Sequence, residues 1–161
     1  MSAMAKYFKV IAENRKARFD YNILETYKAG LILEGFEVKS VRQGKVNLKD
    51  SFGRVIKEDL WIFGMHISPY RAAGKQKIDP LRPRKVLLRK KELVKLIGKA
   101  AEKGLTLVPL KVFFEGNWAK IELGLAKAKK KYEKREKLRR KETEREIKRV
   151  FKGKIHERKN K

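Results

Sequence analysis

Few side chains in this sequence have the types and the spacing that catalysis requires. The two histidines, His66 and His156, are 90 residues apart, and the pair Gly98-Lys99 lacks the earlier glycine of a phosphate-binding loop. The four serines form no nucleophile elbow, and carboxylates in residues 1–126 do not cluster at metal-binding spacings. The sequence has no cysteine, which excludes thiolate metal sites. We therefore expect no catalytic residue, no cofactor and no metal ion.

Cationic and aromatic side chains lie close together in the sequence, and they indicate a different chemistry. Asn14 is followed at once by three cations, Arg15, Lys16 and Arg18. Cations of this kind neutralise phosphates, and aromatic rings near them can stack on bases. Possible stacking rings beside basic residues are those of Tyr7, Phe19, Tyr21 and Tyr70. Each ring could instead pack in the core, so the cations carry the prediction of a nucleic-acid surface.

The C-terminal segment, residues 127–161, is a basic tail with eighteen Lys or Arg residues and six Glu residues. Its few apolar side chains cannot bury enough surface to offset the entropy of ordering, so alone it should be disordered or a fraying helix. Tyr132 lies within the basic run Lys129–Arg135, where no core is available, so a functional contact is favoured for its ring. A solvated helix face is the alternative for the lysines. Basic arms of this kind bind polyanions.

The positive charge is spread over the whole chain. The sequence has 44 Lys and Arg residues against 19 Asp and Glu, a formal net charge of +25, and residues 1–126 hold 26 of those cations and 13 of the acids. This balance favours a nucleic-acid binder with an extended footprint. A membrane-surface protein is second, but no long apolar run, signal peptide or lipidation motif supports it. We expect one domain, residues 1–126, followed by the tail, and a reducing, cytoplasmic location.

Strand patterns outnumber helix patterns in the predicted domain. Residues 107–125 alternate apolar and polar side chains on either side of Glu115-Gly116-Asn117, which predicts a hairpin with one buried face. Further strands are predicted at Phe8–Ala12, Phe36–Val41, Arg54–Phe63 with a turn near residues 57–59, Met65–Ile67 and Lys85–Leu88. The proline-rich and basic segment Ser68–Lys85 is expected to be a functional loop, with a merely solvated loop as the alternative.

Two helices are expected to interrupt the strands. One is predicted over Asn22–Ala29, because Asn22 could cap it, Glu25 would complete a capping box and Gly30 could end it. The other is predicted over Lys90–Lys103 from its apolar stripe. Together these elements predict a mainly β fold: a small antiparallel barrel of the oligonucleotide-binding type, with about six strands, flanking α-helices and the basic tail.

Several runs, in a fixed order, resemble a known family. They are Asn14–Tyr21, Ala29-Gly30, Gly35–Ser40, Arg42, Gly44, Ile67–Tyr70, Asp79–Arg82, Arg84–Leu88, Gly124–Lys127, Lys129-Lys130 and Lys134-Arg135. Their order and spacing from about Ala12 to Arg135 resemble small protein B, the tmRNA-binding (SsrA-binding) family of bacterial trans-translation. The resemblance implies an RNA-binding protein without catalytic activity. It would bind the tRNA-like domain of tmRNA and, with elongation factor Tu, deliver alanyl-tmRNA to the A site of stalled ribosomes.

The resemblance also implies functional positions. The residues expected to contact tmRNA are Asn14, Arg15, Lys16, Arg18, Leu87 and Lys120. Those expected to contact 16S rRNA at the decoding centre and in the empty mRNA channel are Lys129, Lys130, Lys131, Tyr132, Lys134, Arg135, Ile147, Val150 and Phe151. Lys28 occupies a position where the family often has Glu, so a contact there would have to be to phosphate.

A structural ribosomal or other RNA-associated basic protein is the alternative from a different functional class. Such a protein would share the charge, the barrel and the tail. Selective binding of a tRNA-like RNA over other RNAs would distinguish the two. An RNA nuclease or modification enzyme would need a metal or cofactor site that the sequence lacks.

Overall fold

The computed structural model describes residues 8–70, 78–102 and 104–159, except for the side chains of 131–132 and 154–159. The chain divides into two compact units, Met1–Ala128 and Lys129–Lys161. Tyr7 and residues 71–77 of the predicted loop lie outside the described residues.

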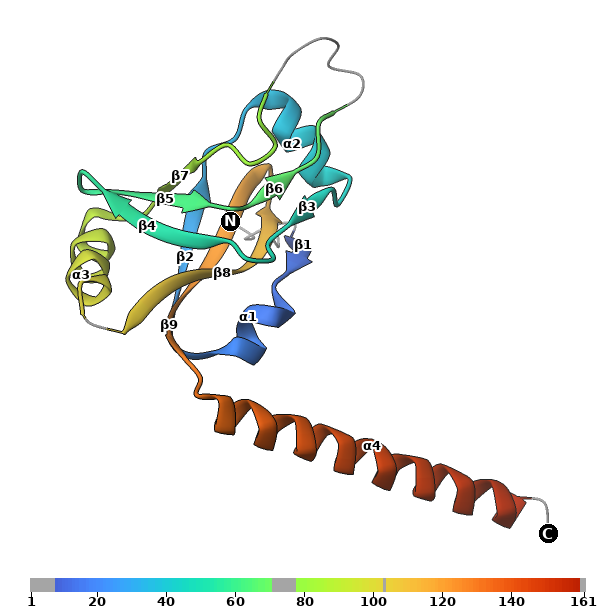
Figure 1. Cartoon of the computed structure of the whole chain (residues 1–161). Coiled ribbons are helices and arrows are strands. Elements are labelled where there is room, and N and C mark those ends of the chain that lie inside the picture. The colour runs from blue at the N-terminus through green and yellow to red at the C-terminus, as the bar shows by residue number, and fades with distance from the viewer. Residues whose placement is uncertain (1–7, 71–77, 103, 160–161) are drawn as a thin grey trace, which may run out of the picture. The chain divides into compact units, whose positions relative to one another are not determined.

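The first unit is an antiparallel barrel (Figure 1). Its main sheet consists of β1 Phe8–Glu13, β2 Tyr21–Leu31, β4 Phe52–Ile56, β5 Asp59–Phe63, β7 Arg84–Leu87, β8 Leu105–Glu115 and β9 Trp118–Ala128. The strand order is β1-β8-β4-β5-β7-β2-β9, and β8 also pairs with β9, so six strands close a ring and β1 adds to it. Two short strands, β3 Val46–Asn47 and β6 His66–Ile67, form a separate pair. The predicted mainly β barrel of about six strands with flanking helices is confirmed.

The hairpin of β8 and β9 supplies much of the core, and its alternation explains why. Val112, Phe114 and Ile121 are almost completely buried and pack in the main hydrophobic cluster. Lys111 and Lys120 lie on the opposite face of the same two strands. The predicted hairpin is present, but its outer face is only partly polar. Phe113 on that face is completely buried, and Leu110 packs with Val108 in a second hydrophobic cluster, because the register shifts between Pro109 and Lys111.

Two predicted elements are wrong, and both errors have a physical reason. The segment predicted as a helix over Asn22–Ala29 is strand β2, in which every second side chain faces inward. Glu25, which suggested a capping box, bonds instead to Lys99 and to the hydroxyl of Tyr27. Both partners donate hydrogen bonds to the carboxylate of Glu25, which lies on the inward side of the strand. The hydrogen bond from Lys99 is the main reason that the pKa of Glu25 is lowered.

The second error is Phe36–Val41, which is predicted as a strand but lies in helix α2, Gly35–Arg42. The amide of Glu34 donates to the carboxylate of Glu37 at 3.0 Å, which stabilises the first turn of the helix. The same carboxylate accepts hydrogen bonds from Arg82 and from Nε of Arg84, the latter at 2.7 Å. Alternation of apolar residues in the sequence does not reveal these distant partners.

The other helices flank the barrel. They are α1 Arg15–Asp20 and α3 Lys90–Ala100. The helix predicted over Lys90–Lys103 is thus confirmed as α3, with Leu96 completely buried. Its Lys99 forms the ion pair with Glu25 that joins α3 to β2.

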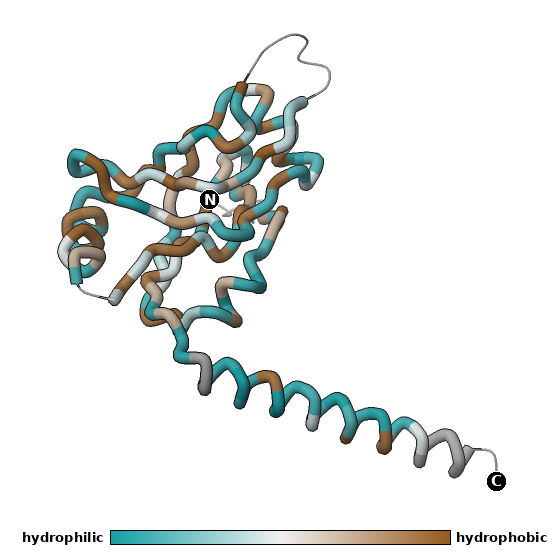
Figure 2. The backbone as a smooth tube through the Cα atoms, in the orientation of Figure 1, coloured by the Kyte–Doolittle hydropathy of each residue, from teal (hydrophilic) through white to brown (hydrophobic). Residues whose placement is uncertain are grey.

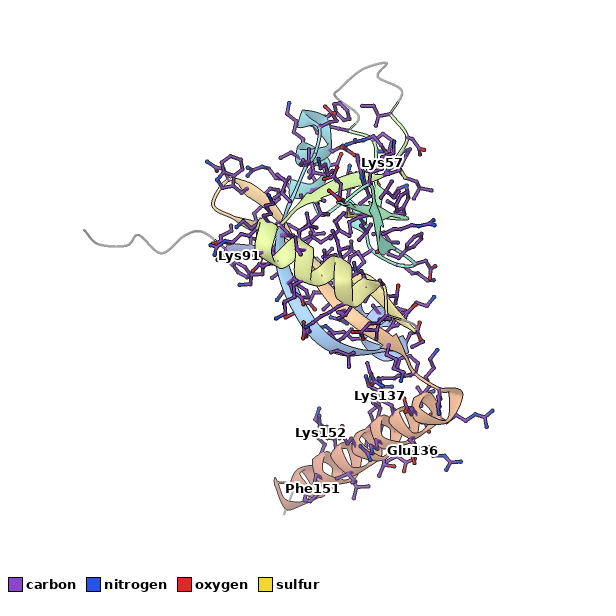
Figure 3. All side chains as sticks on the ribbon, turned by 90° about the vertical axis from the view of Figure 1, so that its left-hand side faces the viewer. Lys57, Lys91, Glu136, Lys137, Phe151 and Lys152 are labelled. Atoms are coloured by element: carbon purple, nitrogen blue, oxygen red, sulfur yellow. The ribbon has the colours of Figure 1, made fainter. Side chains whose placement is uncertain are left out.

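The second unit contains one long helix, α4 Lys131–Lys159, with 29 residues. Most of its residues are hydrophilic, as the teal colour of this helix shows (Figure 2). The labelled side chains of Glu136, Lys137 and Phe151 project from the helix surface (Figure 3). Contact with Lys129, partial burial and the charge of Lys141 lower the pKa of Lys137. Of the two states predicted for the tail, this structure shows the helix.

Candidate nucleic-acid interface

Five neighbouring strands bring one row of residues together on the outer face of the barrel. Lys120 of β9 lies opposite Gly30 of β2, and Gly30 lies opposite Leu87 of β7. On the other side of Lys120 the row continues through Phe113 of β8 to Val10 of β1. Leu87 is 54% exposed, and Gly30 places no side chain between it and Lys120. Two predicted RNA contacts from distant parts of the sequence therefore flank one open position.

A second group of cations surrounds Glu122 on the same face, two residues after Lys120. The Nζ atom of Lys111 lies 3.4 Å from Oε2 of Glu122, and Nη2 of Arg18 lies 4.0 Å from it. Lys28 of β2 is exposed and pairs in register with Glu122. One carboxylate cannot neutralise three cations, so this part of the face keeps a positive charge available for phosphates.

Lys120 also has an intramolecular partner. Its Nζ atom lies 3.3 Å from Oε2 of Glu115, and the two side chains are 34% and 29% exposed. An ion pair with this much exposure contributes little to stability, so a phosphate could replace the carboxylate without a large loss of folding free energy.

Asn14 is buried and holds α1 in place. Its Oδ1 atom accepts from the amide of Ala17, as an N-cap does. Its Nδ2 group donates to the carbonyl oxygens of Leu48 at 3.1 Å and Pro109 at 2.9 Å. Both amide hydrogens of Asn14 are thus already used within the protein. The RNA contact predicted for Asn14 stays untested, and in this structure the side chain positions the cations that follow it.

Helix α1 presents those cations in different directions. Arg15 is exposed and precedes Arg18 by one turn, so the two share a side of the helix. Lys16 instead donates to Oδ1 of Asp50 at 2.9 Å, and this hydrogen bond is the main reason that the pKa of Lys16 is raised. Lys16 and Asp50 line a groove of about 290 Å³ between α1, β4 and β8. The structure therefore brings Arg18, Leu87 and Lys120 to one face, while Lys16 bonds at another.

The predicted ribosome contacts lie in the second unit. Ile147, Val150 and Phe151 fall on one side of α4 and are 51%, 58% and 64% exposed. Lys130 and Arg135 are exposed as well, and Lys129 and Lys134 are partly exposed. The side chains of Lys131 and Tyr132 lie outside the described residues, so the predicted contact of the Tyr132 ring stays a prediction.

Lys111 and Trp118 are surface residues that the sequence reasoning missed. Lys111 contributes to the group around Glu122, and Trp118 is 75% exposed where β9 begins. The alternation in residues 107–125 contained the signal for Lys111, because it places that residue on the polar face with Lys120. No pattern in the sequence distinguishes the exposed ring of Trp118 from a buried one.

Two features are absent from the described residues. No three His, Asp or Glu side chains described in the structure lie close enough together to hold a metal ion. No helix in the described part of the chain is both long and apolar enough to span a bilayer.

Comparison with known proteins gives consistent matches. A family model described as SmpB protein matches residues 11–153. The SsrA-binding protein of Carboxydothermus hydrogenoformans is 56% identical over 145 residues, which cover 90% of this chain and 97% of that protein. The SsrA-binding protein of Geobacillus thermodenitrificans is 57% identical over 143 residues, which cover 89% of this chain and 92% of that protein.

One solved structure is also similar. It is called "tmRNA-SmpB: a journey to the center of the bacterial ribosome", and one of its chains superposes with a TM-score of 0.65 at 51% identity, covering 76% of this chain and 86% of that chain. These matches confirm the resemblance that the ordered sequence runs indicated. The chain therefore belongs to the SmpB, or small protein B, family of SsrA-binding proteins.

Proposed function

We propose that this chain is a cytoplasmic, non-catalytic RNA-binding protein that binds the tRNA-like domain of tmRNA. With elongation factor Tu, it would deliver alanyl-tmRNA to the A site of stalled ribosomes. The names of its relatives support SsrA binding, and the similar solved structure is named for tmRNA, SmpB and the ribosome. The delivery step and the contact with elongation factor Tu rest on the family resemblance.

One observation carries the RNA-binding part of the proposal. Arg18, Leu87 and Lys120 come from three separate segments, and the barrel collects them on one outer face. A folded RNA presents phosphates, 2′-hydroxyls and exposed base edges, and such a face can recognise them by shape and charge. Lys120 and Arg18 would contact phosphates, and Leu87 would pack against a ribose or a base.

The tail would act at a different place. Its helix carries many more cations than acidic side chains, which suits a channel lined by rRNA phosphates. We propose that the segment around Tyr132 meets 16S rRNA at the decoding centre. The apolar group of Ile147, Val150 and Phe151 would make a small contact farther along the empty mRNA channel.

Lys120→Ala tests the RNA-binding face, with Lys91→Ala on helix α3 as the control that removes one exposed cation elsewhere. We expect Lys120→Ala to weaken binding to a tRNA-like RNA. It should also reduce the slope of log K against log salt by about 0.9, because one phosphate contact is lost. Gel shifts or fluorescence anisotropy at several salt concentrations measure both quantities. Lys91→Ala should leave the affinity and the slope unchanged.

A competition experiment separates the proposal from the structural alternative. A tRNA-like RNA should displace labelled tmRNA fragment far better than 5S rRNA does. Equal competition by both RNAs would favour a general ribosomal or RNA-associated protein. An unchanged salt slope for Lys120→Ala would show that this residue does not touch phosphate.

A further inference from the structure

The outer face of β4, β5 and β7 carries a second group of aromatic and cationic side chains. Arg54 of β4 lies opposite Trp61 of β5, and Trp61 lies opposite Lys85 of β7. In the neighbouring pair, Phe52 and Phe63 have stacked rings whose centroids are 5.6 Å apart. Residues paired across strands point to the same face, so these five side chains share one surface. We call them the β4–β5–β7 face.

A hollow lies on this face. Its volume is about 420 Å³, within the range of small-ligand sites. It is lined by Ile56, Lys57, Asp59, Trp61, Phe63 and Pro83. Phe52 and Ile56 are 43% and 40% exposed, although both are large and apolar. Exposed apolar groups gathered beside a hollow are typical of a binding surface.

The charges on the face indicate what would bind there. Lys85 has a carboxylate partner, with its Nζ atom 3.4 Å from Oδ1 of Asp59. Arg54 has no carboxylate within ion-pair distance among the residues that the structure describes. An apolar protein partner would have to bury this guanidinium unpaired, which is unfavourable. Unpaired RNA brings a phosphate with every base and therefore supplies both the missing anion and a ring to stack.

We propose that the β4–β5–β7 face binds an unpaired RNA segment. One base stacks against Trp61 and Phe63, and the phosphates on either side of it contact Arg54 and Lys85. Aromatic rings between cations are the arrangement by which proteins bind single strands without reading their sequence. This site consists of residues other than Arg18, Leu87 and Lys120, so it does not depend on the proposed function.

Tryptophan fluorescence gives a local measurement in the full chain. The sequence has two tryptophans, so Trp118→Phe leaves Trp61 as the single reporter. We expect an eight-nucleotide oligoadenylate to quench the emission of Trp61 in a saturable way, because a stacked base contacts the ring. A blunt RNA duplex of equal charge should quench it far less, since its bases are already stacked on one another. The emission reports the surroundings of the Trp61 ring, and comparison of the two RNAs separates base stacking from attraction by charge alone.

Substitutions that keep Trp61 then test the contacts. Arg54→Ala and Lys85→Ala should each raise the midpoint of Trp61 quenching roughly tenfold, because each removes a charged hydrogen-bond donor to phosphate. Each should also reduce the salt slope by about 0.7. Phe63→Leu should raise the midpoint roughly fivefold or more through lost stacking. Lys91→Ala is the control, because Lys91 lies on helix α3 and is not part of the β4–β5–β7 face. Figure 3 labels Lys91 and also Lys57, which lies in the turn between β4 and β5.

Four results would overturn the proposal. The first is unchanged Trp61 emission at saturating oligoadenylate, and the second is equal quenching by the duplex. The third is equal behaviour of Arg54→Ala and Lys91→Ala in variants with unaltered circular dichroism and thermal midpoint. The fourth is a response of Trp61 to elongation factor Tu or a ribosomal protein but not to RNA, which would assign the face to a protein partner.

Discussion

At the scale of single residues, side chains of similar polarity have different tasks. The family resemblance predicts RNA contacts for both Asn14 and Lys120, yet the side-chain amide of Asn14 donates to two backbone carbonyls inside the protein. Lys120 lies at the surface with a replaceable partner. Glu37 illustrates a third task, because it joins helix α2 to Arg84 of β7 without reaching the surface. Residue type alone could not separate these roles, since each depends on neighbours that are distant in sequence.

Glu37→Gln should strongly destabilise the barrel. Arg84 is completely buried, and the substitution would leave its guanidinium without a carboxylate. Loss of one partner from a buried ion pair lowers the free energy of unfolding by about 3–5 kcal/mol. Urea unfolding at pH 7 measures this effect. Glu102→Gln, at an exposed position, is the control and should change the unfolding free energy little.

The same carboxylate makes stability depend on pH. Burial acts to raise the pKa of Glu37, but bonds from the Glu34 amide, Arg82 and Arg84 outweigh it and hold the pKa below 4.5. The unfolded chain therefore binds this proton at higher pH than the folded chain does. The contribution of Glu37 is fully present above pH 4.5 and is lost as the pH falls through the folded-state pKa. Unfolding curves of Glu37→Gln should lack this part of the acid dependence.

At the scale of secondary-structure elements, both the local sequence pattern and contacts with distant residues decide whether a segment becomes a helix or a strand. The β8–β9 hairpin was predictable from its turn and its alternation, but the register shift between Pro109 and Lys111 was not. Strand β2 was not, because Glu25 and Gly30 match helix signals, while Lys99 of α3 determines where Glu25 can lie. The row from Leu87 to Lys120 was unpredictable for the same reason. The two residues meet across Gly30 only after the barrel closes and sets the register of β7, β2 and β9.

The β4–β5 turn should be open to stabilisation. Lys57 and Glu58 form a two-residue loop with φ angles of 48° and 65°, in the left-handed region that favours Asn and Gly. The double substitution Lys57→Asn and Glu58→Gly should raise the free energy of unfolding by about 1–3 kcal/mol, because it relieves backbone strain. Thermal or urea unfolding measures the change. A lower stability would show that the two native side chains make contacts worth more than the strain.

At the scale of the whole molecule, the chain combines two units that stabilise themselves differently. The barrel has a closed sheet and one main hydrophobic cluster. Helix α4 has large apolar side chains exposed and depends on the local hydrogen bonds of its own backbone. Composition predicted this contrast, because eighteen cations within residues 127–161 leave too few apolar groups for a core. A change that unfolds or removes one unit is therefore expected to leave the other unit folded.

Truncation after Lys130 should separate the two proposed activities. The shortened chain keeps the whole of the unit Met1–Ala128 and should bind tmRNA with nearly unchanged affinity. It should lose peptide transfer to alanyl-tmRNA on stalled ribosomes, because the tail is absent. Gel shifts and a transfer assay with matched concentrations measure the two activities. A large loss of tmRNA affinity would contradict the separation of roles.

Because α4 is one continuous helix, the number of residues between two positions fixes the angle between them about the helix axis. Positions 132 and 150 are eighteen residues apart, which is five full turns at 3.6 residues per turn and about 27 Å along the axis. The two positions therefore lie on one line of the helix, with position 150 in phase with position 132. One residue added between them would turn the far group by about 100° and move it only about 1.5 Å. A change in the length of the tail therefore alters the direction in which the distal apolar group points much more than it alters the distance of that group from position 132.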